Sequence, residues 1–182
     1  MGETCPTWNT SPANEKIRSY VEGGGSYLGI CAGAYYASRT VDFERNTSNE
    51  VYGERQLGFF EGKCLGCIFP GFEYNSERGA RATAVELNRS AWETSNGKNR
   101  PRNANDLPRL MNLYYNGGGS FVDANAVPGT TVLAWYAENN DDAPSKEQPR
   151  RPAIIECSVG SKGGIGILTG VHPEYIASQL DP

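Results

Sequence analysis

Histidine is almost missing from this chain of 182 residues, which contains one imidazole, at His172. A single histidine leaves no ligand set for a multi-histidine zinc site. Apolar runs long enough to span a membrane are missing too. The net charge is −4 and no cluster of lysine or arginine stands out, which argues against binding to a polyanion. We therefore expect no metal, no cofactor, no membrane and no nucleic-acid partner.

The start of the chain, MGETCPTWNTSP, lacks the apolar stretch of a secretory signal peptide. A signal peptide that had already been removed would leave no trace, so this start does not fix the compartment. Lysine provides five of the seventeen basic residues, and three N-x-S/T sequons begin at Asn9, Asn46 and Asn88. These features are compatible with secretion but do not require it. A secreted and a cytoplasmic location both stay open.

The composition is that of an ordinary globular protein, with 38% hydrophobic and 21% charged residues. Such a balance excludes an intrinsically disordered chain. The length fits one domain, at about 100–200 residues per domain, and suffices to bury a hydrophobic core. We expect residues 1–182 to form a single domain.

The chain has an odd number of cysteines, five. If Cys31 is a working thiol, the other four could form two disulfides in three possible pairings. These four are Cys5, Cys64, Cys67 and Cys157. The alternative is that they are buried free thiols, which is a common environment for cysteine.

The first third of the chain predicts an alternation of helix and strand. Apolar residues at helical spacing predict a helix over Asn14–Glu22, and three glycines then end it. Ser26–Ile30 reads as a short buried strand, and a new helix is expected over Tyr35–Arg39 after a tight turn. This order predicts an α/β fold with a mostly parallel sheet.

The rest of the chain predicts mainly strands and loops. Strands are expected at residues 57–62, 80–87, 120–123 and 130–137. Ala153–Val159 and Gly164–Thr169 predict a hairpin. Residues 88–108 and 138–151 are polar or charged and predict loops, and a short helix is expected near Tyr175–Leu180.

The segment Gly29-Ile-Cys31-Ala-Gly33 has the G-x-nucleophile-x-G pattern of a nucleophile elbow. Glycines on either side let a strained nucleophile lie between a strand and a helix without a clash. A thiol at the start of that helix would be favoured as thiolate. The Ala32 N–H would point to the position of an oxyanion. Because a lone cysteine is more often a small buried hydrophobe than a nucleophile, a catalytic role for Cys31 also needs a basic residue elsewhere in the chain.

His172 provides that partner in the segment Val171-His172-Pro173-Glu174, directly after the last expected strand. A cysteine nucleophile needs a base, and the base needs an acceptor that orients it. Glu174 could accept a hydrogen bond from the second ring nitrogen of His172. A histidine in a turn can be merely structural, but the pair follows a strand end, where open α/β sheets place their sites. The sequence thus predicts a Cys31, His172 and Glu174 triad.

Two further motifs have weaker chemical meaning. Cys64-Leu-Gly-Cys67 has C-x-x-C spacing without a second ligand pair, so a disulfide or plain packing fits better than zinc. The glycine-rich turn at residues 117–119 lacks the Lys-Ser/Thr of a P-loop and reads as a loop near the site. Residues of this turn and of the helix after the elbow are candidate substrate contacts: Tyr35, Tyr115, Asn116, Gly117 and Gly118.

Four segments together resemble the amidotransferase-like N-terminal domain of biotin–protein ligases: GGGSYLGICAGAYYAS, PGFEYNSERGARA, YYNGGGSFVDA and LTGVHPEY. They are spread over about residues 14–176. The resemblance implies membership of the class I glutamine amidotransferase-like superfamily and a flavodoxin-like three-layer sandwich with a mostly parallel sheet. It also implies a Cys-His-Glu triad, which maps onto Cys31, His172 and Glu174.

The chain departs from that family pattern at its start and in its motifs. Family members have a strand–helix–strand and a P-G-G loop before the segment that matches residues 14–20, and the loop supplies a second oxyanion donor. About a dozen residues precede the match here, so we expect either a shortened chain or a smaller sheet with an incomplete oxyanion hole. No glycine/arginine-rich adenylate-binding motif is found, so biotinylation by this chain is not expected.

Two functional hypotheses follow. The first is a cysteine-dependent amidohydrolase or amidotransferase-like enzyme that acts on a small-molecule amide or a peptide. The second is a non-catalytic binding or regulatory module, including a secreted interaction protein, that retains the elbow. The short segment before the family match favours the second hypothesis, because loss of an oxyanion donor costs roughly 2.7–4 kcal/mol of transition-state stabilisation.

Overall fold

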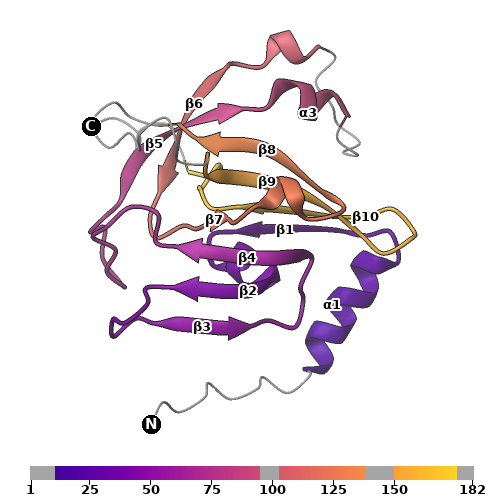
Figure 1. The fold of residues 1–182 in the computed structure, drawn as a ribbon, viewed down its shortest axis with the longest axis horizontal. Coiled ribbons are helices and arrows are strands. Elements are labelled where there is room, and N and C mark those ends of the chain that lie inside the picture. The colour runs from indigo at the N-terminus through magenta and orange to yellow at the C-terminus, as the bar shows by residue number, and fades with distance from the viewer. Residues whose placement is uncertain (1–10, 95–102, 138–149, 176–182) are drawn as a thin grey trace.

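The computed structural model describes residues 11–94, 103–137 and 150–175. Figure 1 shows an arrangement dominated by strands, with helices at the periphery and one short helix beside the first strand. The helices are α1 (Pro12–Glu22), α2 (Ala32–Ala37) and α3 (Arg89–Thr94), with short 3-10 turns at Ala104–Asp106 and Ala124–Ala126. The strands are β1 (Ser26–Ile30), β2 (Ser38–Phe43), β3 (Val51–Glu54), β4 (Phe60–Gly66), β5 (Arg81–Leu87), β6 (Leu110–Tyr115), β7 (Ser120–Phe121), β8 (Thr130–Tyr136), β9 (Pro152–Val159) and β10 (Gly164–Thr169).

The described strands form two mixed sheets. The larger has the order β1-β10-β9-β8-β5-β6, and the smaller has the order β3-β2-β4-β7. Among the described strands, β1 pairs with β10 in parallel and β2 pairs with β4 in parallel, whereas the other neighbours are antiparallel. The α/β class is confirmed. The flavodoxin-like three-layer sandwich with a mostly parallel sheet is not confirmed, because the sheets are largely antiparallel.

A short connection accounts for one of these antiparallel pairs. Parallel neighbours need a crossover of about a dozen residues or more, whereas antiparallel neighbours can be joined by a tight turn. The turn at residues 160–163 joins β9 to β10, so these strands run antiparallel. The hairpin expected from the sequence is therefore confirmed, and it is itself incompatible with a purely parallel sheet.

The start of the chain follows the expectation closely, but the second helix does not. The helix and strand expected before Cys31 correspond to α1 and β1. The helix expected over Tyr35–Arg39 is wrong at its end, because α2 stops at Ala37 and β2 starts at Ser38. Thr40 and Val41 are β-branched residues, which favour a strand, and β2 is held between β3 and β4.

In the middle of the chain the expected strand boundaries shift and two strands are new. The strand expected over residues 57–62 begins later, at Phe60, because Gly58 turns the chain with φ 53°. Strands β3 and β6 were not expected. Part of the segment 88–108, expected to be a loop, forms α3.

Alternating residues of β9 contribute to two hydrophobic cores. Ile155 and Cys157 pack with residues of β2, β4 and α2 in the core shared by the two sheets, whereas Ile154 packs with residues of β5, β6 and α3. Successive side chains of a strand point to opposite faces of its sheet. The central strand β9 is therefore covered on both faces.

The described cysteines do not form the disulfides considered from the sequence. Cys64, Cys67 and Cys157 are free thiols, like Cys31, so the two-disulfide interpretation is wrong and the alternative of free cysteines applies. Cys5 and almost all of the expected helix at Tyr175–Leu180 lie outside the described residues. None of the described helices is long and apolar enough to cross a membrane.

Candidate active site

Cys31 lies at the turn between β1 and α2 with φ 49° and ψ −104°. This backbone conformation is unfavourable for a residue with a side chain, and such strain concentrates at functional sites. The Cys31 N–H donates to the Thr169 carbonyl oxygen at 2.8 Å, which ties the turn to the end of β10. A strained residue between a strand and the next helix is the backbone arrangement that the G-x-C-x-G pattern predicts.

The two glycines of the elbow have different reasons to be small. A Cβ at Gly29 would lie 2.7 Å from the Gly33 carbonyl oxygen, so this position needs glycine. A Cβ at Gly33 would meet the Tyr27 hydroxyl at 3.6 Å, an ordinary contact. The expected clash therefore exists on the strand side of Cys31 and not on the helix side.

The neighbouring strand brings His172 to the same edge of the sheet. β1 and β10 run in parallel with Ile30 opposite Thr169, and His172 follows three residues later. His172 Nδ1 donates to Glu174 Oε1 at 2.7 Å, because the carboxylate is an acceptor. This bond leaves Nε2 with a lone pair that can accept a proton. The His172 N–H also donates to the Tyr114 carbonyl oxygen at 2.8 Å, which fixes the turn.

The thiol of Cys31 is protonated at rest. Burial raises its pKa to about 11, the Ala32 N–H partly opposes this shift, and the charge of Glu174 adds to it. The expectation that the helix start favours a thiolate is therefore outweighed by burial. The thiol donates to the Asn116 carbonyl oxygen at 3.6 Å, and no hydrogen bond joins Cys31 to His172 among the described residues.

The glycine-rich turn is held by three tyrosine hydroxyls, each of which donates to one glycine carbonyl. Tyr35 bonds to Gly117 at 3.1 Å, Tyr115 bonds to Gly118 at 2.9 Å and Tyr136 bonds to Gly119 at 2.9 Å. A Cβ at Gly118 would collide with the Gly170 carbonyl oxygen, so the turn packs directly on the chain that leads from β10 to His172. The turn thereby fixes the Asn116 carbonyl beside Cys31.

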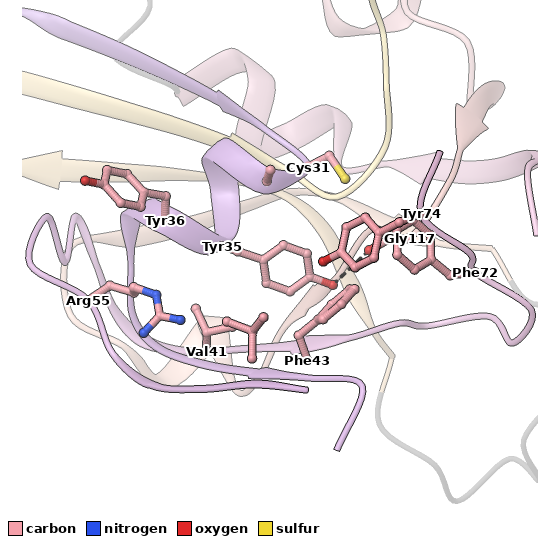
Figure 2. A pocket seen from close by; sticks show the side chains of 11 residues that line it. Cys31, Tyr35, Tyr36, Val41, Phe43, Arg55, Phe72, Tyr74 and Gly117 are labelled. Atoms are coloured by element: carbon pink, nitrogen blue, oxygen red, sulfur yellow. Dashed lines mark hydrogen bonds between the residues drawn. The ribbon is translucent and has the colours of Figure 1, made fainter. Parts of the chain in front are cut away.

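A pocket of about 250 Å³ opens beside the thiol. Figure 2 shows Cys31, Phe72, Tyr74 and Gly117 at one end and Arg55 with Tyr36 at the other. Tyr35, Val41 and Phe43 lie between these ends in the same view. A second depression, of about 390 Å³, shares Phe72 and Tyr74 with the pocket and is lined by Asn116 and the loop at residues 73–77.

The predicted substrate contacts fall into three groups. Tyr35 and Gly117 line the pocket beside the thiol, and Asn116 lines the neighbouring depression. Gly118 is not among the lining residues of either. Tyr115 is fully buried, and its hydroxyl also accepts hydrogen bonds from the N–H groups of residues 68 and 69. This position suits a structural role for Tyr115 and does not fit direct contact with a substrate.

Sequence reasoning missed several residues that shape the site. Arg55, Phe72 and Tyr74 line the pocket, and Tyr136 holds the glycine turn. The segment PGFEYNSERGARA contains Phe72 and Tyr74 and is one of the four segments that resemble the family. Arg55 carried no signal in the sequence.

A family model described as the N-terminal part of biotin-protein ligase matches residues 5–182. The chain belongs to the biotin-protein ligase N-terminal family. The resemblance drawn from the four sequence segments is confirmed.

Two relatives of this chain are longer than the chain itself. A biotin–protein ligase of Schizosaccharomyces pombe is 37% identical over 174 residues, which cover 95% of this chain and 24% of the relative. An uncharacterized protein of Chlamydia muridarum is 30% identical over 162 residues, which cover 88% of this chain and 52% of the relative. The chain thus spans about a quarter of the first relative and about half of the second.

The chemistry open to this family member is that of its thiol, its imidazole and its backbone donors. Within residues 11–94, 103–137 and 150–175, no group of three or more His, Cys, Asp or Glu side chains is arranged to hold a metal. The N–H of Ala32, the first residue of α2, bonds to the Cys31 sulfur. A strained thiol, an oriented imidazole and a backbone donor are the groups that acyl transfer requires.

Proposed function

We propose that this member of the biotin-protein ligase N-terminal family is a cysteine-dependent amidohydrolase or amidotransferase-like enzyme that acts on an amide. The observation that carries the proposal is the backbone conformation of Cys31, φ 49° and ψ −104°. Strain of this kind persists only when the surrounding structure imposes it, and it concentrates where it serves a mechanism. The His172–Glu174 pair at the end of the neighbouring strand supports the same assignment.

In the proposed reaction, the Cys31 thiol leaves the Asn116 carbonyl and gives its proton to His172 Nε2. The sulfur attacks the carbonyl carbon of the amide, and the Ala32 N–H stabilises the oxyanion that forms. His172 then donates the proton to the leaving amine, which departs as the carbon–nitrogen bond breaks. Water, deprotonated by His172, or an acceptor amine cleaves the resulting thioester and regenerates the thiol.

The test is the pH dependence of Cys31 acylation by p-nitrophenyl acetate, followed by mass spectrometry. If His172 is the base, acylation does not depend on the free thiolate, so the rate should reach a plateau well below the pKa of about 11 that burial gives the Cys31 thiol. The His172→Gln variant should lose about 10²–10⁴-fold in rate at neutral pH. Its residual rate should keep rising toward pH 11, where the buried thiol itself ionises.

The Cys67→Ser variant is the matched control, because it removes another free thiol and leaves Cys31 intact. It should acylate like the unmodified protein. Equal rates in the unmodified protein and His172→Gln, both rising tenfold per pH unit through pH 10, would exclude His172 as the base. Absence of acylation at Cys31 at every pH would favour the non-catalytic binding module instead.

A further inference from the structure

The pocket beside Cys31 has a chemical character that limits what it can bind. Aromatic and aliphatic side chains form most of its lining: Tyr35, Tyr36, Val41, Phe43, Val51, Phe72 and Tyr74. Their rings pack edge to face, with Phe43 at 5.3 Å from Tyr35 and 5.6 Å from Phe72, between ring centroids. Since an apolar cavity of about 150 Å³ holds one benzene molecule, a pocket of about 250 Å³ accepts a somewhat larger apolar group.

Arg55 is the cationic group in this lining. It is half-buried, and one guanidinium nitrogen, Nη1, donates to the Glu54 carbonyl oxygen at 2.9 Å. No carboxylate of the described residues forms an ion pair with it. A guanidinium has five donors and binds carboxylates in a planar, two-pronged geometry. Arg55 therefore presents unused donors to the pocket.

Tyr35, Val41 and Phe43 separate the thiol from this cation (Figure 2). A ligand that occupies the whole pocket meets a nucleophile at one end, an apolar surface in the middle and a positive charge at the other end. We infer that the substrate is an amide with an apolar body and a terminal carboxylate, oriented with its amide at Cys31 and its carboxylate at Arg55. This inference rests on the proposed function and names the substrate class of the same site.

The lining argues against a free α-amino acid such as glutamine. The α-ammonium group of an amino acid needs a partner when it leaves water. Among the described residues that line the pocket there is no aspartate or glutamate. In the middle of the pocket the Tyr35 hydroxyl already donates to the Gly117 carbonyl oxygen, and Val41 and Phe43 have no polar side-chain atoms, so a hydrocarbon or aromatic body fits better there than a second polar group.

The experiment measures binding to the Cys31→Ser variant by isothermal titration calorimetry, so that turnover does not interfere. The ligands are adipamic, suberamic and sebacamic acid, each compared with its methyl-terminated analogue, hexanamide, octanamide or decanamide, and with glutamine. We expect the best-fitting carboxylated amide to bind about tenfold more tightly than its uncharged analogue, because a hydrogen bond to a charged group is worth that much. Adding Arg55→Gln should abolish this difference.

Two further variants in the Cys31→Ser background separate charge from shape. Arg109→Gln removes an exposed arginine that pairs with Glu86 outside the pocket, and it should keep the tenfold preference. Tyr74→Ala removes an exposed ring of the lining and should weaken charged and uncharged amides equally. Circular dichroism and thermal melting should show that each variant is folded.

Equal binding of charged and uncharged amides, a preference that survives Arg55→Gln, or tighter binding of glutamine would overturn the inference. Ammonia release from octanamide by the unmodified protein, without any preference for suberamic acid, would overturn the inference and leave the proposed function standing. Conversely, an Arg55-dependent preference together with absent acylation of Cys31 would keep the ligand class and overturn the proposed function.

Discussion

At the scale of one residue, Cys31 combines a strained backbone with a buried thiol whose pKa is raised. Its backbone conformation costs about 1–3 kcal/mol relative to a relaxed residue, and burial raises the pKa of its thiol to about 11. The G-x-C-x-G pattern predicted the position of this residue but not its protonation state. Burial depends on the chain segments that cover the thiol, and those come from distant parts of the sequence.

The backbone strain at Cys31 predicts an unusual order of stability among variants. Glycine adopts a positive φ without a steric penalty, whereas alanine does not. We therefore expect Cys31→Gly to have a free energy of unfolding about 1 kcal/mol higher than Cys31→Ala, opposite to the order at ordinary sites. Urea denaturation of the two variants measures this difference. A less stable glycine variant would mean that the elbow is relaxed in solution.

The turn between β6 and β7 has the strictest packing requirements at the scale of an element. Three tyrosines from α2, β6 and β8 bond to its glycine carbonyls, and Gly118 packs against the backbone at Gly170. The sequence indicated a glycine-rich loop near the site. It gave no sign that the loop is buried, because the tyrosines are separated from it by up to 82 positions.

Replacing glycines in two turns should have very different effects. In Gly118→Ala the new Cβ meets the Gly170 backbone, which is unable to move without displacing His172. We therefore expect the free energy of unfolding to fall by about 3 kcal/mol or more. In Gly163→Ala the Cβ has open space and only the positive φ of 77° is unfavourable, at about 1–2 kcal/mol. Thermal and urea denaturation measure both losses. Similar losses would show that the glycine turn has room to adapt.

The two sheets of the whole molecule enclose several free thiols. Cys64 and Cys157 lie in the core shared by the sheets, and burial raises the pKa of both, that of Cys157 to about 12. In the unfolded chain a thiol has a pKa of about 8.5. Below that pH each thiol is protonated in both the folded and the unfolded protein, and its contribution to the free energy of unfolding is fully present. Above it the unfolded chain loses protons that the folded protein retains, so stability falls as the pH rises.

We therefore expect the free energy of unfolding to decrease between about pH 9 and 11, by about 1.4 kcal/mol per pH unit for each such thiol. The Cys157→Ala variant should show a slope smaller by about that amount, even though the truncation lowers its stability at neutral pH. Urea titrations at several pH values give the two slopes. Identical slopes would mean that Cys157 ionises at the same pH in the folded and unfolded states.

The sequence by itself determined the local features of this protein and its family. The helix and strand before Cys31, the hairpin before His172 and the four family segments all depend on neighbouring residues, and each could be read directly. The tertiary structure decided three features: which strands run parallel or antiparallel, that the described cysteines are free thiols, and which residues line the pocket. Arg55, Phe72 and Gly117 line one cavity with Cys31 because the packing of the two sheets brings distant segments together. Such contacts are set by the balance of burial and pairing over the whole chain, which local spacing does not contain.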